Sequence, residues 1–296
     1  MNHKACQQSG CYFDAIAQSD FCWQHTENKS GYQKKIEELV QEGYDFSAAS
    51  FHRVNFGGLN FNGGNFKACN FTASYLKGAN LSNGNLTGCD FRRANLEQVN
   101  LTHAQLTSAK MEGVLLDRAS VIAANLTEAI LNYANLSFTN LSRANLTKIS
   151  ARHAMLIGAN LEGATIDGAN FAFANLKGAN AKSIHGAFAI LGGALLLEAN
   201  FEDADLNRAN LVGTDARKAN FKQANLYFIR PGSANFSNAN FEGANLSRAI
   251  CREVNLTQAN LINTNIDGAV FERARLNDIQ PKNLDFSKNN TNGAEF

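Results

Sequence analysis

Residues 79–101 read ANLSN GNLTG CDFRR ANLEQ VNL, in which a large apolar residue returns at every fifth position. The same count runs without a break from Phe46 to Phe296 and gives 51 such positions, here called slots, of which Phe, Leu, Ile, Val or Met fills 43. The other eight slots hold Ala151, Ala181, Gly186, Ala216, Pro231, Cys251, Pro281 and Thr291. Two residues before the slot, Ala occupies 31 of the 51 positions. A period of five fits neither an amphipathic helix nor an alternating strand, so the pattern indicates a repeat architecture.

The repeated word is Ala-Asn-Leu-x-x or Ala-Asn-Phe-x-x, as at Ala79-Asn80-Leu81 and Ala239-Asn240-Phe241. It closely resembles the repeat of the pentapeptide-repeat family, and the resemblance covers about 85% of the chain. The resemblance implies an all-β solenoid, a right-handed quadrilateral β-helix in which four five-residue sides close each coil. The period alone also allows coils with another number of sides.

In such a coil the slot residue and the Ala two positions earlier face the axis, and the other three positions face outward. Ala recurs because a corner beside Leu or Phe leaves little room in a close-packed core. Coils stack at roughly 4.8 Å, the spacing of neighbouring strands, so residues 20 apart lie above one another. Residues 44–296 then form about 12 coils, residues 30–43 a capping helix and residues 1–29 a zinc-binding module.

The composition suits neither a polyanion nor a strong DNA binder. Lys and Arg number 27 against 26 Asp and Glu, which gives a net charge of +1. The N-terminus lacks the apolar run of a signal peptide, and nothing approaches the length of a membrane-spanning segment. We therefore expect a cytoplasmic protein without a membrane segment. Six cysteines in 296 residues do not make a disulfide scaffold.

The N-terminal segment contains a sequence motif that is typical of a metal site. Cys6, Cys11, Cys22 and His25 follow the spacing C-x4-C-x10-C-x2-H, and these two close ligand pairs suit tetrahedral Zn²⁺. Four protein ligands close the coordination shell, so we expect the zinc to be structural. The segment looks like a treble-clef or knuckle-type module, although its spacing departs from the retroviral C-x2-C-x4-H-x4-C knuckle. Free thiols in a flexible tail and a disulfide are the alternatives, and His3 is a possible substitute ligand.

A short helix is expected next, with Ser30 as its N-cap and Gly43 at its end in the left-handed conformation. Its apolar stripe is formed by Tyr32, Ile36, Leu39 and Val40. A solenoid needs its first coil covered, because that coil otherwise exposes apolar side chains and unpaired backbone. Helix and zinc module together are interpreted as this cap. Docking of nucleic acid or of a partner by the zinc module is the alternative.

Several outward positions of the central coils are apolar, although outward positions of a soluble rod should be polar. They predict a surface for a protein partner on one side of the coil, here called the middle face. The other possibility is a local distortion that turns some of them inward, since Gly186 empties a core slot nearby and residues 183–198 depart most from the repeat word. The residues of the middle face are Leu115, Tyr133, Phe138, His153, Met155, Ile157, Phe173, Leu195 and Leu197.

Two prolines stand in slots, and a proline cannot donate a hydrogen bond to the neighbouring coil. We expect a bulge or a change of corner at Pro231, and the same at Pro281. The count continues to Phe296 with no helix after it, so the last coil is either open or paired with another molecule. End-to-end dimerisation through Phe286 and Phe296 is the corresponding hypothesis.

The sequence contains no nucleotide-binding loop, metalloprotease helix or serine-hydrolase motif, and a straight filled rod offers no cleft. We therefore expect no enzyme. Some pentapeptide-repeat proteins resemble DNA and bind DNA gyrase through an acidic face and a dimer formed by a C-terminal helix. Here Glu and Lys alternate at Glu162, Lys182 and Glu202, and that helix is missing, so a DNA-mimicking protein that binds gyrase or another topoisomerase is the alternative function. A non-catalytic scaffold or regulator with an unidentified protein partner remains the main prediction, in keeping with cyanobacterial family members that act in differentiation signalling.

Overall fold

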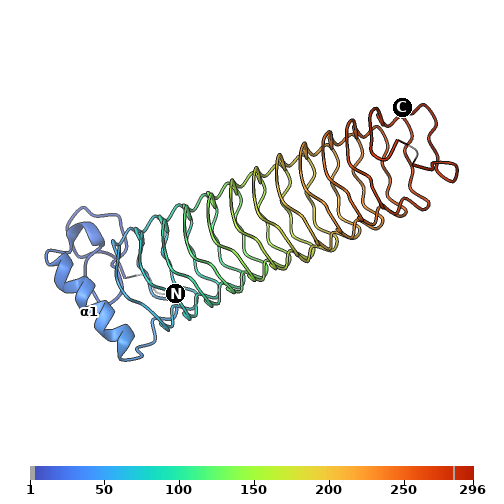
Figure 1. Cartoon of the computed structure of the whole chain (residues 1–296). Coiled ribbons are helices and arrows are strands. Elements are labelled where there is room, and N and C mark those ends of the chain that lie inside the picture. The colour runs from blue at the N-terminus through green and yellow to red at the C-terminus, as the bar shows by residue number, and fades with distance from the viewer. Residues whose placement is uncertain (1–3, 283) are drawn as a thin grey trace.

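The computed structural model describes residues 4–282 and 284–296, so His3 lies outside the described residues. The chain forms one long solenoid, and two short helices lie at its N-terminal end (Figure 1). These are the 3-10 helix η1 (Trp23–His25) and the α-helix α1 (Lys29–Gln41). Neither helix has the length and apolarity needed to cross a lipid bilayer, and this holds for the whole described part of the chain.

Single-residue parallel β-bridges, rather than long strands, join the coils in the described residues. Each bridge pairs a residue with the one 20 positions later, from Asp45↔Asn65 to Arg275↔Glu295. In the coil around Asn80, for example, its N–H donates to Leu59 O at 2.8 Å, and the next residue, Leu81, donates to Asn100 O at 2.7 Å. Every coil therefore bonds to the coil before it and the coil after it. A rod of stacked turns results, with no free edge along its length.

The repeat word explains the tight corners. An Asn that stands before a slot can turn its side-chain oxygen back onto its own chain: Asn160 Oδ1 accepts from Glu162 N at 3.1 Å, and Asn240 Oδ1 accepts from Glu242 N at 3.1 Å. Asn side chains favour this bond to the backbone two residues on. The same amides also bond from coil to coil, since Asn180 Nδ2 donates to Asn160 Oδ1 at 3.1 Å. Asn thus closes the corner and links neighbouring coils at once.

The slots build a continuous core. Phe51, Phe71 and Phe91 are fully buried, and their rings stack at centroid distances of 5.1 and 5.0 Å. The alanines two residues before the slots are buried as well from Ala79 to Ala274. Cys69 and Cys89, which take that position on adjacent coils, are free thiols, and each donates to a slot carbonyl, Phe46 O or Phe66 O, at 2.9 Å.

The helix differs in detail from its prediction. Asn28, not Ser30, is the N-cap, because Asn28 Oδ1 accepts from Gly31 N at 2.8 Å, whereas Ser30 lies inside the first turn. The helix ends at Gln41 instead of extending to residue 43. Gly43 follows with φ +79° and donates to Val40 O, a left-handed end as expected. Tyr32, Ile36 and Val40 are buried and Leu39 is half-buried, so the apolar stripe is confirmed.

The N-terminal segment takes the place of a preceding coil. Carbonyls at the bridging positions, which elsewhere accept from the coil before, here accept from other groups: Ser50 O from Ala17 N at 2.7 Å, Asn55 O from Gln33 Nε2 at 2.6 Å and Asn60 O from Gln41 Nε2 at 3.0 Å. Asn60 N donates to Glu37 Oε1 at 2.6 Å. The Tyr32 ring packs parallel to Phe56 at 6.3 Å. Edge hydrogen-bonding groups and apolar surface of the first coil are therefore both covered.

The prediction of a bulge or a change of corner at Pro231 is wrong. Residues 231–235 keep the corner and bridge positions of the repeat, and Pro231 is buried. The cost is local: within the described residues no bridge joins Arg230 to Ile250, because the proline nitrogen carries no hydrogen to donate. At Pro281 the described residues do leave the pattern, and pairing resumes where Asn290 meets Val270.

Gly186 does not leave an empty slot. A Cβ there would lie 2.8 Å from Ile166 Cγ1 and 2.9 Å from Leu206 Cδ2, so side chains of the two neighbouring coils already fill the space. Residues 183–198 keep the same corner and bridge positions as the rest of the rod. The local distortion considered for this stretch is absent from the backbone pattern of these residues.

Candidate functional site

The four residues predicted to bind metal come together. Nδ1 of His25 lies 3.4 Å from Sγ of Cys6 and 3.4 Å from Sγ of Cys22, and the Cys11 and Cys22 sulfurs are 3.8 Å apart. All four ligand atoms lie within 4.8 Å of one another. A tetrahedral zinc with Zn–S of about 2.3 Å and Zn–N of about 2.0 Å requires S–S edges of about 3.8 Å and S–N edges of about 3.5 Å. The donor set therefore fits a tetrahedral metal ion.

Two local structures position the ligands. Cys6 and Cys11 lie on a small hairpin, in which Cys6 N donates to Phe13 O at 3.0 Å and Cys11 N to Gln8 O at 3.1 Å. Cys22 is the residue before η1 and His25 is the last residue of η1, and His25 N donates to Cys22 O at 3.0 Å. Each pair is thus fixed by its own backbone turn, and folding of the segment brings the two turns face to face.

The neighbouring thiols influence one another's protonation. Burial raises the pKa of Cys6. Hydrogen bonds with the Cys22 and Gln8 backbone, with His25 and with Cys11 lower that pKa by more than burial raises it, so that it falls to about 6. The Phe13 N–H lowers the pKa of Cys11, but burial and the neighbouring Cys6 and Cys22 sulfurs outweigh it and raise that pKa. Several thiolates this close repel each other unless a cation sits among them.

Phe13 and Trp23 join the N-terminal segment to the first coils and to α1. Phe13 packs against the His52 ring at 6.2 Å and under the Arg53 guanidinium at 4.7 Å. Trp23 meets Tyr32 of α1 at 6.1 Å. Phe21 of the same segment is exposed.

None of the nine middle-face residues is buried: Ile157 and Leu197 are half-buried and the other seven are exposed. Their centre is a column of three parallel rings. His153 lies 5.2 Å from Tyr133, with 2° between the ring planes, and 5.2 Å from Phe173, with 10°. Tyr133 is 69% and Phe173 56% exposed. A continuous ladder of aromatic faces and edges thus stands in solvent over three successive coils.

The backbone at these rings is unusual for bulky side chains. From Ala48 to Asp278 the second residue after each slot has a left-handed conformation, with φ of +60° at Tyr133, +56° at Phe138 and +59° at Phe173. Glycine adopts the left-handed conformation without strain, whereas a residue with a Cβ is strained by about 1–2 kcal/mol. Bulky rings at these corners thus oppose folding slightly and display apolar area to solvent, which is the pattern of a binding surface.

At the C-terminal end, Phe286 packs edge-on against the core residue Phe271 at 5.4 Å. Phe296 meets Phe286 at 5.5 Å and is itself 66% exposed. Of the two residues proposed for dimerisation, Phe286 is therefore half-covered by its own chain, and Phe296 presents most of its ring to solvent.

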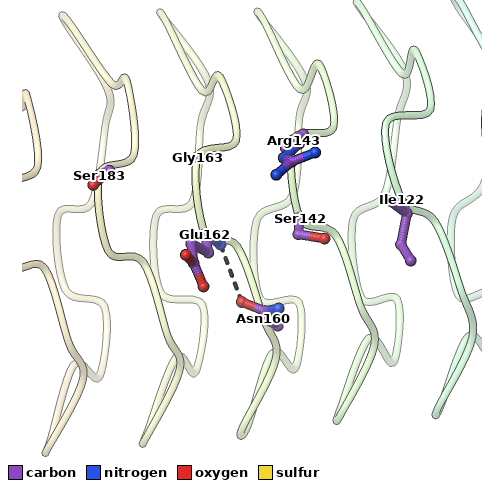
Figure 2. A pocket seen from close by; sticks show the side chains of 7 residues that line it. All are labelled: Ile122, Ser142, Arg143, Asn160, Glu162, Gly163 and Ser183. Atoms are coloured by element: carbon purple, nitrogen blue, oxygen red, sulfur yellow. Dashed lines mark hydrogen bonds between the residues drawn. The ribbon is translucent and has the colours of Figure 1, made fainter.

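A hollow of about 300 Å³ lies between Arg143 and Glu162 on the central coils (Figure 2). The bond drawn in it, from Glu162 N to Asn160 Oδ1, is the corner bond of the repeat. The hollow exists because small residues, among them Gly163 and Ser183, line it. It is a consequence of the repeat rather than a specialised site.

A second hollow, which we did not predict, contains three arginines: Arg208, Arg230 and Arg248. In the sequence, Pro231 is the feature that marks this stretch, and the three arginines lie far apart along the chain. The signal lay in the columns, because Phe188, Arg208, Phe228 and Arg248 follow one another at intervals of 20.

Comparison with known families agrees with the fold. Residues 44–121 match the description "Pentapeptide repeat region", and residues 111–147, 149–180, 189–227 and 234–278 match "Pentapeptide repeats (8 copies)". No curated protein sequence matches the chain significantly.

Solved structures of low identity resemble the chain. HetL, a pentapeptide repeat protein involved in heterocyst differentiation regulation from the cyanobacterium Nostoc sp. Strain PCC 7120, is 24% identical over 84% of this chain and 93% of its own, with a TM-score of 0.32. A pentapeptide repeat protein from the Arabidopsis thaliana thylakoid lumen is 22% identical over 48% and 70%, with a TM-score of 0.23. Full-length QnrB1, a plasmid-mediated fluoroquinolone resistance protein, is 15% identical over 86% and 91%, with a TM-score of 0.16.

Proposed function

Because this chain belongs to the pentapeptide-repeat family, we propose that it is a non-catalytic protein-interaction scaffold whose partner docks on the middle face. The observation that carries this is the exposed ring column Tyr133–His153–Phe173. Exposed apolar surface of this kind marks interaction sites on soluble proteins, and aromatic side chains dominate binding energy at such sites.

The ring spacing suits one kind of partner. Successive rings of the column are 5.2 Å apart along the rod, and an α-helix advances about 5.4 Å per turn. A helix laid along the rod would therefore place one apolar residue per turn against each coil, in the manner of helix-in-groove recognition. We infer that the docking segment of the partner is an amphipathic α-helix.

Within this proposal, the solenoid is a right-handed, four-sided coil with about 12 turns. The N-terminal segment and α1 are its cap, supported by the bonds to Ser50 O, Asn55 O and Asn60 O. A structural zinc ion on Cys6, Cys11, Cys22 and His25 holds that cap together, supported by the fit of the ligand distances to a tetrahedron.

Partner docking can be tested by photo-crosslinking from position 152, next to His153, in the source cell. One cross-linked protein is expected, joined through a helix-forming segment with apolar residues at every third or fourth position. The double variant Phe173→Asp, Leu197→Asp should lose the cross-link, because each change places a charge on the apolar contact surface.

The matched control is Ile262→Asp, which changes a similarly exposed apolar residue at 42% exposure on distant coils and should keep the cross-link. Circular dichroism should show that all variants stay folded. A cross-link that survives in the folded double variant, or one to a second copy of this chain, would contradict the proposal.

We also propose that two copies pair end to end through Phe286 and Phe296, because Phe296 leaves most of its ring exposed beside the end of the core. Light scattering is expected to give twice the chain mass of 32.1 kDa, and Phe296→Asp should halve that mass. A monomer at every concentration of the unchanged protein would refute the pairing.

A further inference from the structure

The hollow around Arg230 is lined by positively charged side chains and by no negatively charged one. It has a volume of about 400 Å³, within the range of small-ligand sites. Arg208, Arg230 and Arg248 line it, and the lining includes no carboxylate. Among the described residues, none of the three arginines forms an ion pair.

Three carboxylates on neighbouring coils are engaged elsewhere. Asp205 Oδ1 accepts from Asn207 Nδ2 and from Asn225 Nδ2, both at 2.9 Å. Asp203 pairs with Lys182 at 3.7 Å, and Glu253 accepts from Ser233 Oγ at 3.1 Å and pairs with Arg273 at 3.7 Å. This contrasts with other arginines of the rod, such as Arg217, which pairs with Asp215 at 2.7 Å. The three guanidinium groups are therefore free to bind an external anion.

Aromatic rings share the hollow with the arginines. The Arg208 guanidinium lies 5.5 Å from the centroid of Phe188, and Arg248 Nη1 donates to Tyr227 Oη at 3.4 Å. Tyr227 and Phe228 are half-buried, with their rings 6.1 Å apart. Guanidinium forks match the oxygens of a phosphate, whereas ring faces favour stacking with a flat group.

We propose that this hollow binds a small phosphate ester with a flat aromatic ring, of the nucleotide class. Arg230 and Arg248 hold the phosphate, and Phe228 with Tyr227 supplies the surface on which the ring stacks. The missing bridge between Arg230 and Ile250, caused by Pro231, leaves the Ile250 carbonyl without its usual slot N–H donor, while Arg230 keeps both backbone bonds to the preceding coil, to Ala209 O and from Leu211 N. The site is distinct from the middle face and does not depend on the scaffold proposal.

Isothermal titration of the full chain with adenosine 5′-monophosphate, adenosine and inorganic phosphate tests this. The monophosphate should bind more tightly than either part. The double variant Arg230→Gln, Arg248→Gln should weaken monophosphate and phosphate binding at least tenfold, since it removes two charge-assisted contacts. Phe228→Leu should weaken monophosphate binding and leave phosphate binding unchanged.

The matched control is Arg93→Gln. Arg93 is exposed and has the same left-handed corner conformation as Arg248, with φ of +58° at both. It should bind all probes as the unchanged protein does. Absence of saturable monophosphate binding, equal affinity for phosphate and monophosphate, or equal weakening by Arg93→Gln would each overturn the proposal.

Discussion

Protein purified in reducing, chelator-free buffer is expected to contain one zinc ion per chain, and Cys22→Ser is expected to contain none. Cys22 is at the centre of the cluster, 3.8 Å from the Cys11 sulfur and 3.4 Å from His25 Nδ1. Its loss leaves three protein ligands and opens the shell. Mass spectrometry of the metal content measures this directly, and cobalt substitution would report tetrahedral thiolate ligation by visible absorption.

The energetic effect should be large and local. Structural zinc sites contribute about 10–16 kcal/mol of apparent binding free energy at neutral pH, and a segment this short has no adequate core of its own. Chelation should therefore unfold residues 4–28 and raise amide exchange there, with the central coils unchanged. Cys251→Ala, which alters a buried cysteine far from the cluster, should keep its zinc. A zinc-free protein with the same protected N-terminal amides would rule out the site.

Phe71→Ala is expected to lower the free energy of unfolding by about 3–5 kcal/mol, the usual cost of removing a buried phenylalanine. Phe71 is fully buried between Phe51 and Phe91, so the ring stack of three coils would lose its middle member. Urea denaturation followed by circular dichroism measures the change. The first coils should unfold ahead of the rest, since each coil is supported only by its neighbours.

The matched control for Phe71→Ala is Phe138→Ala, the same substitution at a ring that is 54% exposed. It should change the free energy of unfolding by about 0.5 kcal/mol or less. Equal destabilisation by the two substitutions would mean that the slots do not form the core.

The core could be predicted residue by residue because a slot is a local property. Leu81 and Phe241 face the axis because they stand in a five-residue count, whatever lies elsewhere in the chain. The metal ligands could be predicted for a similar reason, since two short spacings define two turns. The cap residue of α1 could not, because Asn28 and Ser30 are both good N-caps and only the three-dimensional course of the chain selects one.

Properties that depend on neighbouring coils were harder to predict. The filled space at Gly186 depends on the side chains of Ile166 and Leu206, which are 20 residues away on either side. The arginine hollow depends on which carboxylates are already engaged, for example Asp205 by two amides. The chain keeps its regular coil at Pro231 because neighbouring backbone hydrogen bonds remain, such as Ile250 N to Ile229 O. Reading columns identifies neighbours, but the rotamers that settle these contacts come only with the structure.

The bridges between residues 20 apart also determine which changes in chain length the protein can tolerate. If the coils kept their register, insertion of one residue would turn every later Leu or Phe outward and bring the residue before it, often Asn, into the slot. Deletion of five residues would keep the core but shift each later outward side chain to the adjacent side of the coil. Only gain or loss of a whole turn leaves both the core and the surface columns in place. Such a chain should lengthen and shorten over evolution by duplication and loss of 20-residue units, and changes of other lengths should be rare.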